Sequence, residues 1–254
     1  MRQAMRLGLT MLFMALTGVR ALAAPSCDVP ASLATPHTEG PSDREKQRLL
    51  PIGSYTLSLI WLPQQCRNDR EGFGCDNRRT AGFVLHGLWP DGKDKDWPQW
   101  CKPADVLPAA TISAHYCATP SSQLLQHEWS KHGTCMDGYT PERYFALSNK
   151  LFGDFIQPKL RSLSYHRQTV ASVQKAIADV NPGMQPDMMR LYLDKKGWLR
   201  EVWLCLDTRF KMQACPAHQG GAKPEDQVLI WRGGQSGRNE SAESGRRASH
   251  YARY

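Results

Sequence analysis

Eight cysteines that follow an apolar leader limit the fold of this chain more than any other feature of its sequence. The leader, residues 1–23, has a basic start, an apolar run over 7–19 and a small-residue pattern from Ala21 to Ala23, which is typical of a secretory signal peptide. An even number of cysteines beyond such a leader predicts up to four disulfides. No CxxC pair is present, which disfavours zinc binding by cysteine. We therefore expect a disulfide-stapled protein that is secreted or periplasmic once the leader is removed.

Charge and hydropathy say less about partners. The apolar run of the leader is far shorter than the roughly twenty residues that span a bilayer, so we expect no membrane association of the mature form. Without Arg2, Arg6 and Arg20 the chain keeps 29 basic and 24 acidic side chains, a net charge of +5. This balance favours contact with polyanions only weakly, because many exported proteins are mildly basic.

The remaining sequence divides into three parts. Residues 24–53 predict an N-terminal arm with a short helix, since Ser42 and Glu45 have the three-residue spacing of a capping box. Residues 54–232 carry the hydrophobic patterns of one folded domain with a substantial core. Residues 233–254 are rich in Gly, Ser and Arg without periodicity, and we expect them to be disordered.

The domain mixes strands and helices without strict alternation, which predicts an α+β fold. Alternating apolar residues over 55–61 predict a strand with one buried face, and the apolar run 81–88 predicts a central strand covered on both sides. Helices are expected over 121–132 with Thr119 as N-cap, from Thr140 onward, and over 171–180. Residues 188–193 and 198–206 predict a hairpin.

Two motifs, about forty residues apart, concentrate the reactive side chains. Residues 83–92 read FVLHGLWPDG and carry His86, and residues 124–135 read LLQHEWSKHGTC. On a helix, residues four apart share a face, so the second motif directs four polar groups toward one cleft: His127, Glu128, Lys131 and His132. Imidazoles, a cation and a carboxylate together can move protons and stabilise charge at a phosphoryl centre without a metal.

Other hydrolase chemistries fit less well. The zinc signature HExxH needs its histidines four apart, whereas His127 and His132 are five apart, about 140° around a helix. The sequence contains no GxSxG elbow, no Walker motif and no dinucleotide glycine motif. We therefore expect no metal and no cofactor.

Both motifs resemble those of the T2 family of secreted ribonucleases, and the similarity covers roughly residues 54–216. The resemblance implies a central, mainly antiparallel sheet packed against several helices. It also implies that His132 is the general base and His86 the general acid. His127 then holds the phosphate, and Lys131 with Glu128 stabilises the pentacoordinate intermediate.

The resemblance extends to the base contacts and to two disulfides. It implies that Trp89 offers a stacking surface for a base, with Asp91 a weaker candidate for base contact. It pairs Cys101 with Cys135 and Cys205 with Cys215. Residue reasoning leaves open whether Cys117 joins Cys27, Cys66 or Cys75.

The expected partner is RNA, because the attacking 2′-hydroxyl belongs to the substrate, and DNA should not be cleaved. We expect a monomer. The alternative reading is a basic RNA-binding or interaction protein that keeps the same scaffold without turnover, and a metal-dependent hydrolase ranks third.

Overall fold

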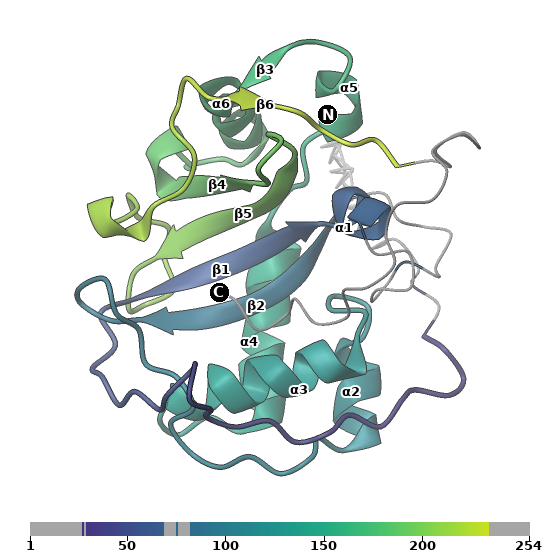
Figure 1. Cartoon of the computed structure of the whole chain (residues 1–254), viewed down its shortest axis with the longest axis vertical. Coiled ribbons are helices and arrows are strands. Elements are labelled where there is room, and N and C mark those ends of the chain that lie inside the picture. The colour runs from purple at the N-terminus through teal and green to yellow at the C-terminus, as the bar shows by residue number, and fades with distance from the viewer. Residues whose placement is uncertain (1–26, 28, 69–74, 76–81, 234–254) are drawn as a thin grey trace, which may run out of the picture.

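A four-stranded antiparallel sheet forms the centre of the molecule in a computed structural model, which describes residues 27, 29–68, 75 and 82–233 (Figure 1). Its strand order is β2-β1-β5-β4. The strands span Ser54–Trp61 (β1), Phe83–Asp91 (β2), Met189–Leu193 (β4) and Leu199–Leu206 (β5). A two-stranded sheet pairs Gln168–Thr169 (β3) with Gln227–Val228 (β6). The expected α+β class and the antiparallel sheet are confirmed.

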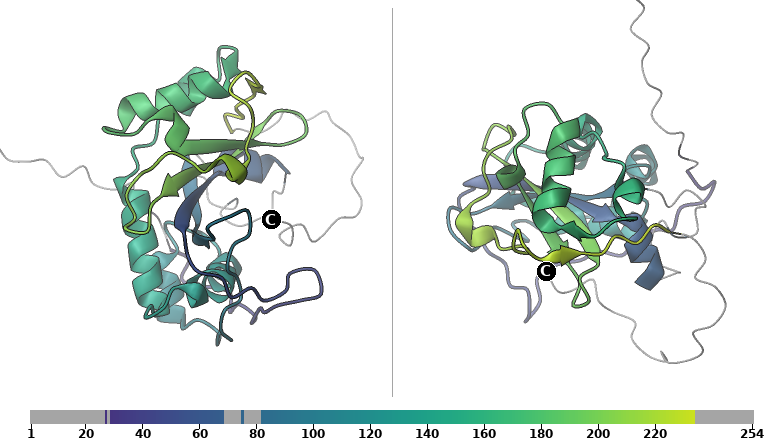
Figure 2. Two further views of the ribbon diagram at one scale, coloured as in Figure 1. Left: turned by 90° about the vertical axis from the view of Figure 1, so that its left-hand side faces the viewer. Right: turned by 90° about the horizontal axis from the view of Figure 1, so that it is seen from above.

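Within the described part of the chain six helices lie around the sheet, and Figure 2 shows α4 and α6 along one of its faces. Their bounds are Leu62–Asn68 (α1), Ala109–His115 (α2), Ser122–Lys131 (α3), Pro141–Asp154 (α4), Leu160–Leu163 (α5) and Val170–Val180 (α6). Short 3-10 turns lie at Gly133–Cys135, Pro186–Met188 and Ala217–Gln219. Among the described residues, no helix is both long enough and apolar enough to cross a membrane.

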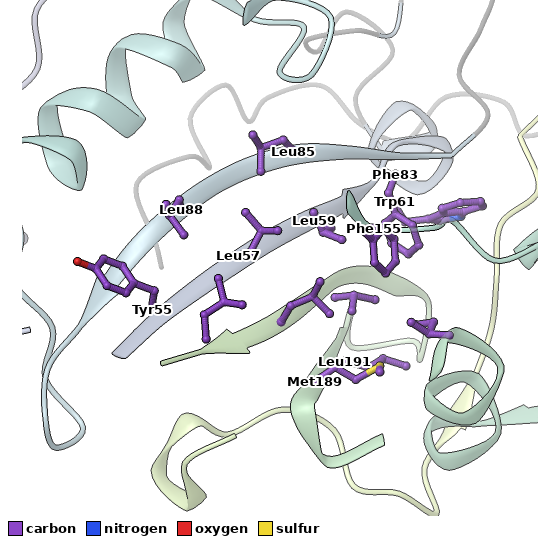
Figure 3. Close-up of a cluster of buried hydrophobic side chains, with 14 of the residues drawn as sticks. Tyr55, Leu57, Leu59, Trp61, Phe83, Leu85, Leu88, Phe155, Met189 and Leu191 are labelled. Carbon is purple, nitrogen blue, oxygen red and sulfur yellow. The ribbon is translucent and has the colours of Figure 1, made fainter. Parts of the chain in front are cut away.

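The apolar core lies between the sheet and these helices (Figure 3). Leu57 and Leu59 of β1 are almost fully buried in the same core cluster as Leu85 of β2 and Leu191 of β4. Because side chains alternate along a strand, the intervening residues of β1 face the opposite side of the sheet. These are the polar residues Thr56 and Ser58, which are also completely buried. The prediction that 55–61 has only one buried face is therefore wrong, and the second buried face carries polar groups.

Several local predictions differ from the structure. From Phe83 onward the apolar run 81–88 belongs to β2, which is an edge strand rather than a central one and is contacted by α3 and α4. The α3 helix begins with Ser121 as N-cap, whose Oγ accepts a hydrogen bond from the Leu124 backbone N–H. Thr119, the expected cap, instead donates to the backbone oxygen of Leu85.

The helix expected after Ser42 is absent from the described arm. Ser42 Oγ does accept a hydrogen bond from the Glu45 N–H, as in a capping box, but the chain only bends there. It straightens because Arg48 pairs with Gln99 through two backbone hydrogen bonds, which hold this part of the arm extended. The helix from Thr140 and the hairpin of β4 and β5 are confirmed.

Four disulfides fasten this fold. They join Cys27 to Cys117, Cys66 to Cys75, Cys101 to Cys135 and Cys205 to Cys215. The last two are the pairs that the family resemblance implies, and Cys27 is the partner of Cys117 that sequence left open. The predicted leader, residues 1–23, and residues 234–254 of the predicted disordered tail lie outside the described residues.

Candidate active site

A β-bulge in β2 sets the position of His86. In the pairing of β1 with β2, Ser58 lies opposite Gly87 and Leu59 lies opposite Leu85, so His86 is the extra residue on β2. A bulge bends the strand and redirects the side chain of the extra residue, and such irregularities are frequent beside active sites. The His86 side chain is buried and faces α3, where its Nε2 lies 3.6 Å from Glu128 Oε1.

The end of α3 supplies the other reactive groups. Glu128 and Lys131 are 1% and 2% exposed, and His132, the C-cap of the helix, is 5% exposed. Charged side chains this deeply buried are rare unless they are paired. The position of this helix end is fixed because Trp100 donates its backbone N–H to the Lys131 oxygen at 2.8 Å and the neighbouring Cys101 is bonded to Cys135.

Trp89 connects the two motifs. Its Nε1 donates to Glu128 Oε2 at 2.7 Å. Its ring stacks on His132 with centroids 5.4 Å apart and meets His86 edge-on at 4.9 Å. The ring is 9% exposed, so it is covered rather than offered as an open stacking platform for a base. Its contacts instead order the carboxylate and the two imidazoles around one indole.

Gly87 makes the close approach of Glu128 possible. A β-carbon at position 87 would overlap Glu128 Oε2 and would lie 2.8 Å from Trp89 Nε1. The glycine of the first motif therefore leaves the space into which the carboxylate of the second motif fits.

The N-terminal arm runs beside α3 (Figure 1) and brings two carboxylates to His127 and Lys131. Glu39 Oε2 lies 2.6 Å from His127 Nδ1, and Glu45 Oε1 accepts a hydrogen bond from Lys131 Nζ at 2.8 Å. Gln123 on α3 also bonds to the arm, through Glu39 and the backbone of His37. His127, expected to hold the phosphate, and Lys131, expected to stabilise the pentacoordinate intermediate, thus each contact a carboxylate of the same chain.

The two central imidazoles differ in proton affinity. Burial and the nearby Lys131, His127 and His86 lower the pKa of His132 well below its ordinary value. Burial also opposes the charge on His86, but Glu201 and Glu128 outweigh it and raise the pKa of His86. One imidazole is therefore suited to accept a proton and the other to donate one near neutral pH.

The two carboxylates beside His86 have pKa values shifted in opposite directions. Burial raises the pKa of Glu128, although His86 and the Trp89 hydrogen bond oppose the shift. Burial acts in the same direction on Glu201 of β5, but His86 and Trp203 outweigh it, so the pKa of Glu201 is lowered. Glu201 thus stays charged beside the imidazole.

Asp91 lies two residues beyond Trp89 on the same face of β2. Its Oδ2 accepts a hydrogen bond from Thr56 Oγ1 at 2.7 Å. Burial raises its pKa to about 6, although Thr56 and His218 act in the opposite direction. A contact between Asp91 and a base remains a prediction.

Three side chains of this site bring possible metal donors together. One donor atom each from His127, Glu128 and His132 lie within 4.8 Å of one another. The argument from a continuous helix, which separated the two histidines by about 140°, is wrong because α3 ends at Lys131. His132 is the C-cap of α3 with φ −110°, and its ring centroid lies 6.4 Å from that of His127. The same donors are the groups expected to move protons, so a bound metal would compete with that chemistry.

A profile of the ribonuclease T2 family matches residues 52–215. That span is more than half of the sequence and contains both motifs. The chain belongs to the ribonuclease T2 family. The first motif of this T2 protein lies on β2 and the second on α3 and the 3-10 turn after it.

Ribonucleases of bacteria and plants are similar in sequence to this T2 chain. A probable ribonuclease of Haemophilus influenzae is 29% identical over 180 residues, which cover 65% of this chain and 61% of that protein. A ribonuclease of Aeromonas hydrophila is 31% identical over 60% of this chain and 71% of its own length. Intracellular ribonuclease LX of Solanum lycopersicum is 33% identical over 59% and 75%. The chain therefore spans about three fifths of the Haemophilus relative.

Solved structures show the same T2 fold. Trichomaglin, described as a novel S-like ribonuclease, superposes with a TM-score of 0.56 at 19% identity, over 70% of this chain and 97% of its own. An RNase-related protein from Calystegia sepium has the same TM-score at 22% identity, over 70% and 96%. At these identities the likeness concerns the fold alone.

Sequence reasoning named the candidate reactive groups of this site but not the carboxylates that contact them. The structure brings together His86, Trp89, Glu128, Lys131 and His132, with His127 at the rim. It adds Glu39, Glu45 and Glu201, none of which lies in either motif. Glu201 had a faint signal, because it and the adjacent Arg200 are the charged residues of an otherwise apolar predicted strand.

Proposed function

We propose that this protein is an exported endoribonuclease that cleaves single-stranded RNA by attack of the ribose 2′-hydroxyl on the adjacent phosphate. Membership of the T2 family and the names of its relatives support RNA cleavage, and the four disulfides fit an oxidising compartment. The expected products are 2′,3′-cyclic phosphates, followed by 3′-phosphates.

One observation carries the mechanistic proposal: His86 and His132 contact the same Trp89 ring and have pKa values shifted in opposite directions. Neutral His132 takes the proton of the 2′-hydroxyl as its oxygen attacks phosphorus. Protonated His86 gives its proton to the departing 5′-oxygen. For hydrolysis of the cyclic phosphate the roles reverse, and His86 activates water while His132 protonates the 2′-oxygen.

The remaining polar side chains are proposed to bind the phosphate and to stabilise the negative charge that develops on it. Negative charge grows on the non-bridging oxygens as the pentacoordinate intermediate forms, and a buried cation stabilises it more effectively than an exposed one. Lys131, 2% exposed at the end of α3, is the proposed source of that stabilisation, with His127 holding the phosphate. Glu128 accepts a hydrogen bond from Trp89 Nε1, and this bond holds the carboxylate beside Lys131 and the two imidazoles.

Homopolymer RNAs and a matched DNA oligonucleotide, each digested with and without a chelator, test the proposal. Mass spectrometry of the termini should show cyclic phosphates that convert to 3′-phosphates, with equal rates in the chelator and with intact DNA. Products with 5′-phosphate ends, or cleavage that stops in the chelator, would overturn the proposed mechanism.

A further inference from the structure

The imidazole of His86 lies between two carboxylates, and only one of them comes from the catalytic motifs. Its Nε2 faces Glu128 on α3 at 3.6 Å, and its Nδ1 faces Glu201 Oε1 on β5 at 3.4 Å. Glu201 is 6% exposed, so the pair is shielded from solvent. In such a pair the partner of one ring nitrogen fixes the tautomer and the orientation of the other.

Glu201 is itself held in one orientation by neighbours on the sheet. Its Oε2 accepts hydrogen bonds from Ser58 Oγ at 3.1 Å and from Trp203 Nε1 at 2.6 Å. Ser58 lies opposite Trp203 in the pairing of β1 with β5, so both donors belong to the rigid centre of the sheet. Because both donors bind Oε2, Oε1 is left directed at His86.

We propose that Glu201 is a positioning residue for the general acid: it holds Nδ1 of His86 so that Nε2 presents its proton to the leaving 5′-oxygen, and it stabilises the imidazolium. This inference rests on the proposed function of His86. The charged groups that face His86 are Glu201 from β5 and Glu128 and Lys131 from α3, with His132 beyond Trp89. Of these, Glu201 contacts the nitrogen that does not face the catalytic helix.

Glu201→Gln tests this arrangement with little change of shape, because the amide oxygen can still accept from Ser58 and Trp203. We expect kcat to fall at least tenfold with KM nearly unchanged, since the substrate does not touch Glu201. The alkaline limb of the pH profile should move to lower pH, because His86 loses the charge that keeps it protonated. Glu225→Gln, an exposed carboxylate, is the matched control and should behave as the unaltered protein.

A double-mutant cycle separates positioning from general destabilisation. In a His86→Ala background, Glu201→Gln should cause no further loss of kcat. An additive loss, or an unchanged alkaline limb in the single variant, would overturn the inference. If Glu201→Gln does not fold, Trp203→Phe decides instead: it removes one donor to Oε2, and an unchanged kcat and alkaline limb would overturn the inference.

The same variants distinguish a failure of the proposed function from a failure of the role proposed for Glu201. If His86→Ala keeps full activity, the assignment of the general acid is wrong. If His86→Ala is inactive while Glu201→Gln matches the control in kcat and pH profile, the acid assignment stands and only the role of Glu201 fails.

Discussion

Gly87 of β2 lies so close to the carboxylate of Glu128 that a β-carbon at position 87 would occupy the place of Glu128 Oε2. The two residues are 41 apart in sequence and belong to different motifs. The distance between β2 and α3 is therefore set by a residue without a side chain. Any larger residue there must push the carboxylate, and with it the hydrogen bond to Trp89, out of position.

Gly87→Ala should accordingly lower kcat by about a hundredfold, the scale of a misplacement of about 1 Å in an active site. Overpacking should also cost about 1–3 kcal/mol of unfolding free energy. Steady-state kinetics and thermal unfolding measure both effects. Gly153→Ala in α4 is the control, since nothing lies within 4 Å of its β-carbon and the change should stabilise the helix by roughly 0.5–1 kcal/mol. Full activity of Gly87→Ala would contradict the role given to this contact.

The opposed proton affinities of the two imidazoles predict a broad pH optimum. The proposed mechanism needs neutral His132, whose pKa lies well below 6.5, and protonated His86, whose pKa lies above 6.5. The acid limb of kcat/KM should therefore fall below pH 6.5 and the alkaline limb above it. His86→Ala and His132→Ala should each lose roughly a hundredfold or more in rate. The exposed His166→Ala serves as control, and an acid limb above pH 6.5 would reverse the assignment.

The carboxylates of the arm should compete with substrate phosphate. Glu39 and Glu45 contact His127 and Lys131, so under the proposed mechanism a substrate phosphate must displace them to reach the same two side chains. Glu39→Gln and Glu45→Gln should lower KM, together by about fivefold, which corresponds to about 1 kcal/mol for partly screened pairs. Initial rates at increasing concentrations of a homopolymer RNA, at fixed salt, give the KM of each variant. Asp43→Asn removes an exposed charge from the same arm and should leave KM nearly unchanged. An equal or higher KM in the glutamate variants would show that the pairs assist binding.

Asp91 should make folding stability depend on pH. Its pKa rises from 3.8 to about 6 on folding, so the folded state favours the protonated carboxyl. The penalty is absent below pH 3.8, grows as pH rises, and is complete above pH 6, at about 3 kcal/mol. Asp91→Asn should therefore raise the unfolding free energy at pH 7 and not at pH 3.5, as measured by denaturant titration. A variant less stable at pH 7 would contradict this account.

The features that could be predicted from the sequence are those that depend on residues close together in the chain. Alternation and helix caps located most strands and helices, and the spacing of Glu128, Lys131 and His132 placed their side chains together. It could not predict that His86 is the bulged residue of β2, because a bulge depends on the register with a strand more than twenty residues earlier. It also missed Glu201, whose distance from His86 depends on sheet order, and the turn after Ser42, where pairing with Gln99 overrides the capping signal.

The disulfide between Cys27 and Cys117 joins the start of the arm to the segment just before α3. Glu39 lies twelve residues beyond this covalent anchor, so its carboxylate is confined near His127 at an effective concentration that dilution cannot lower. Occupation of His127 and Lys131 by the arm is therefore an intramolecular equilibrium. It should be the same at every protein concentration, whereas substrate, salt, pH or reduction of that bond should shift it.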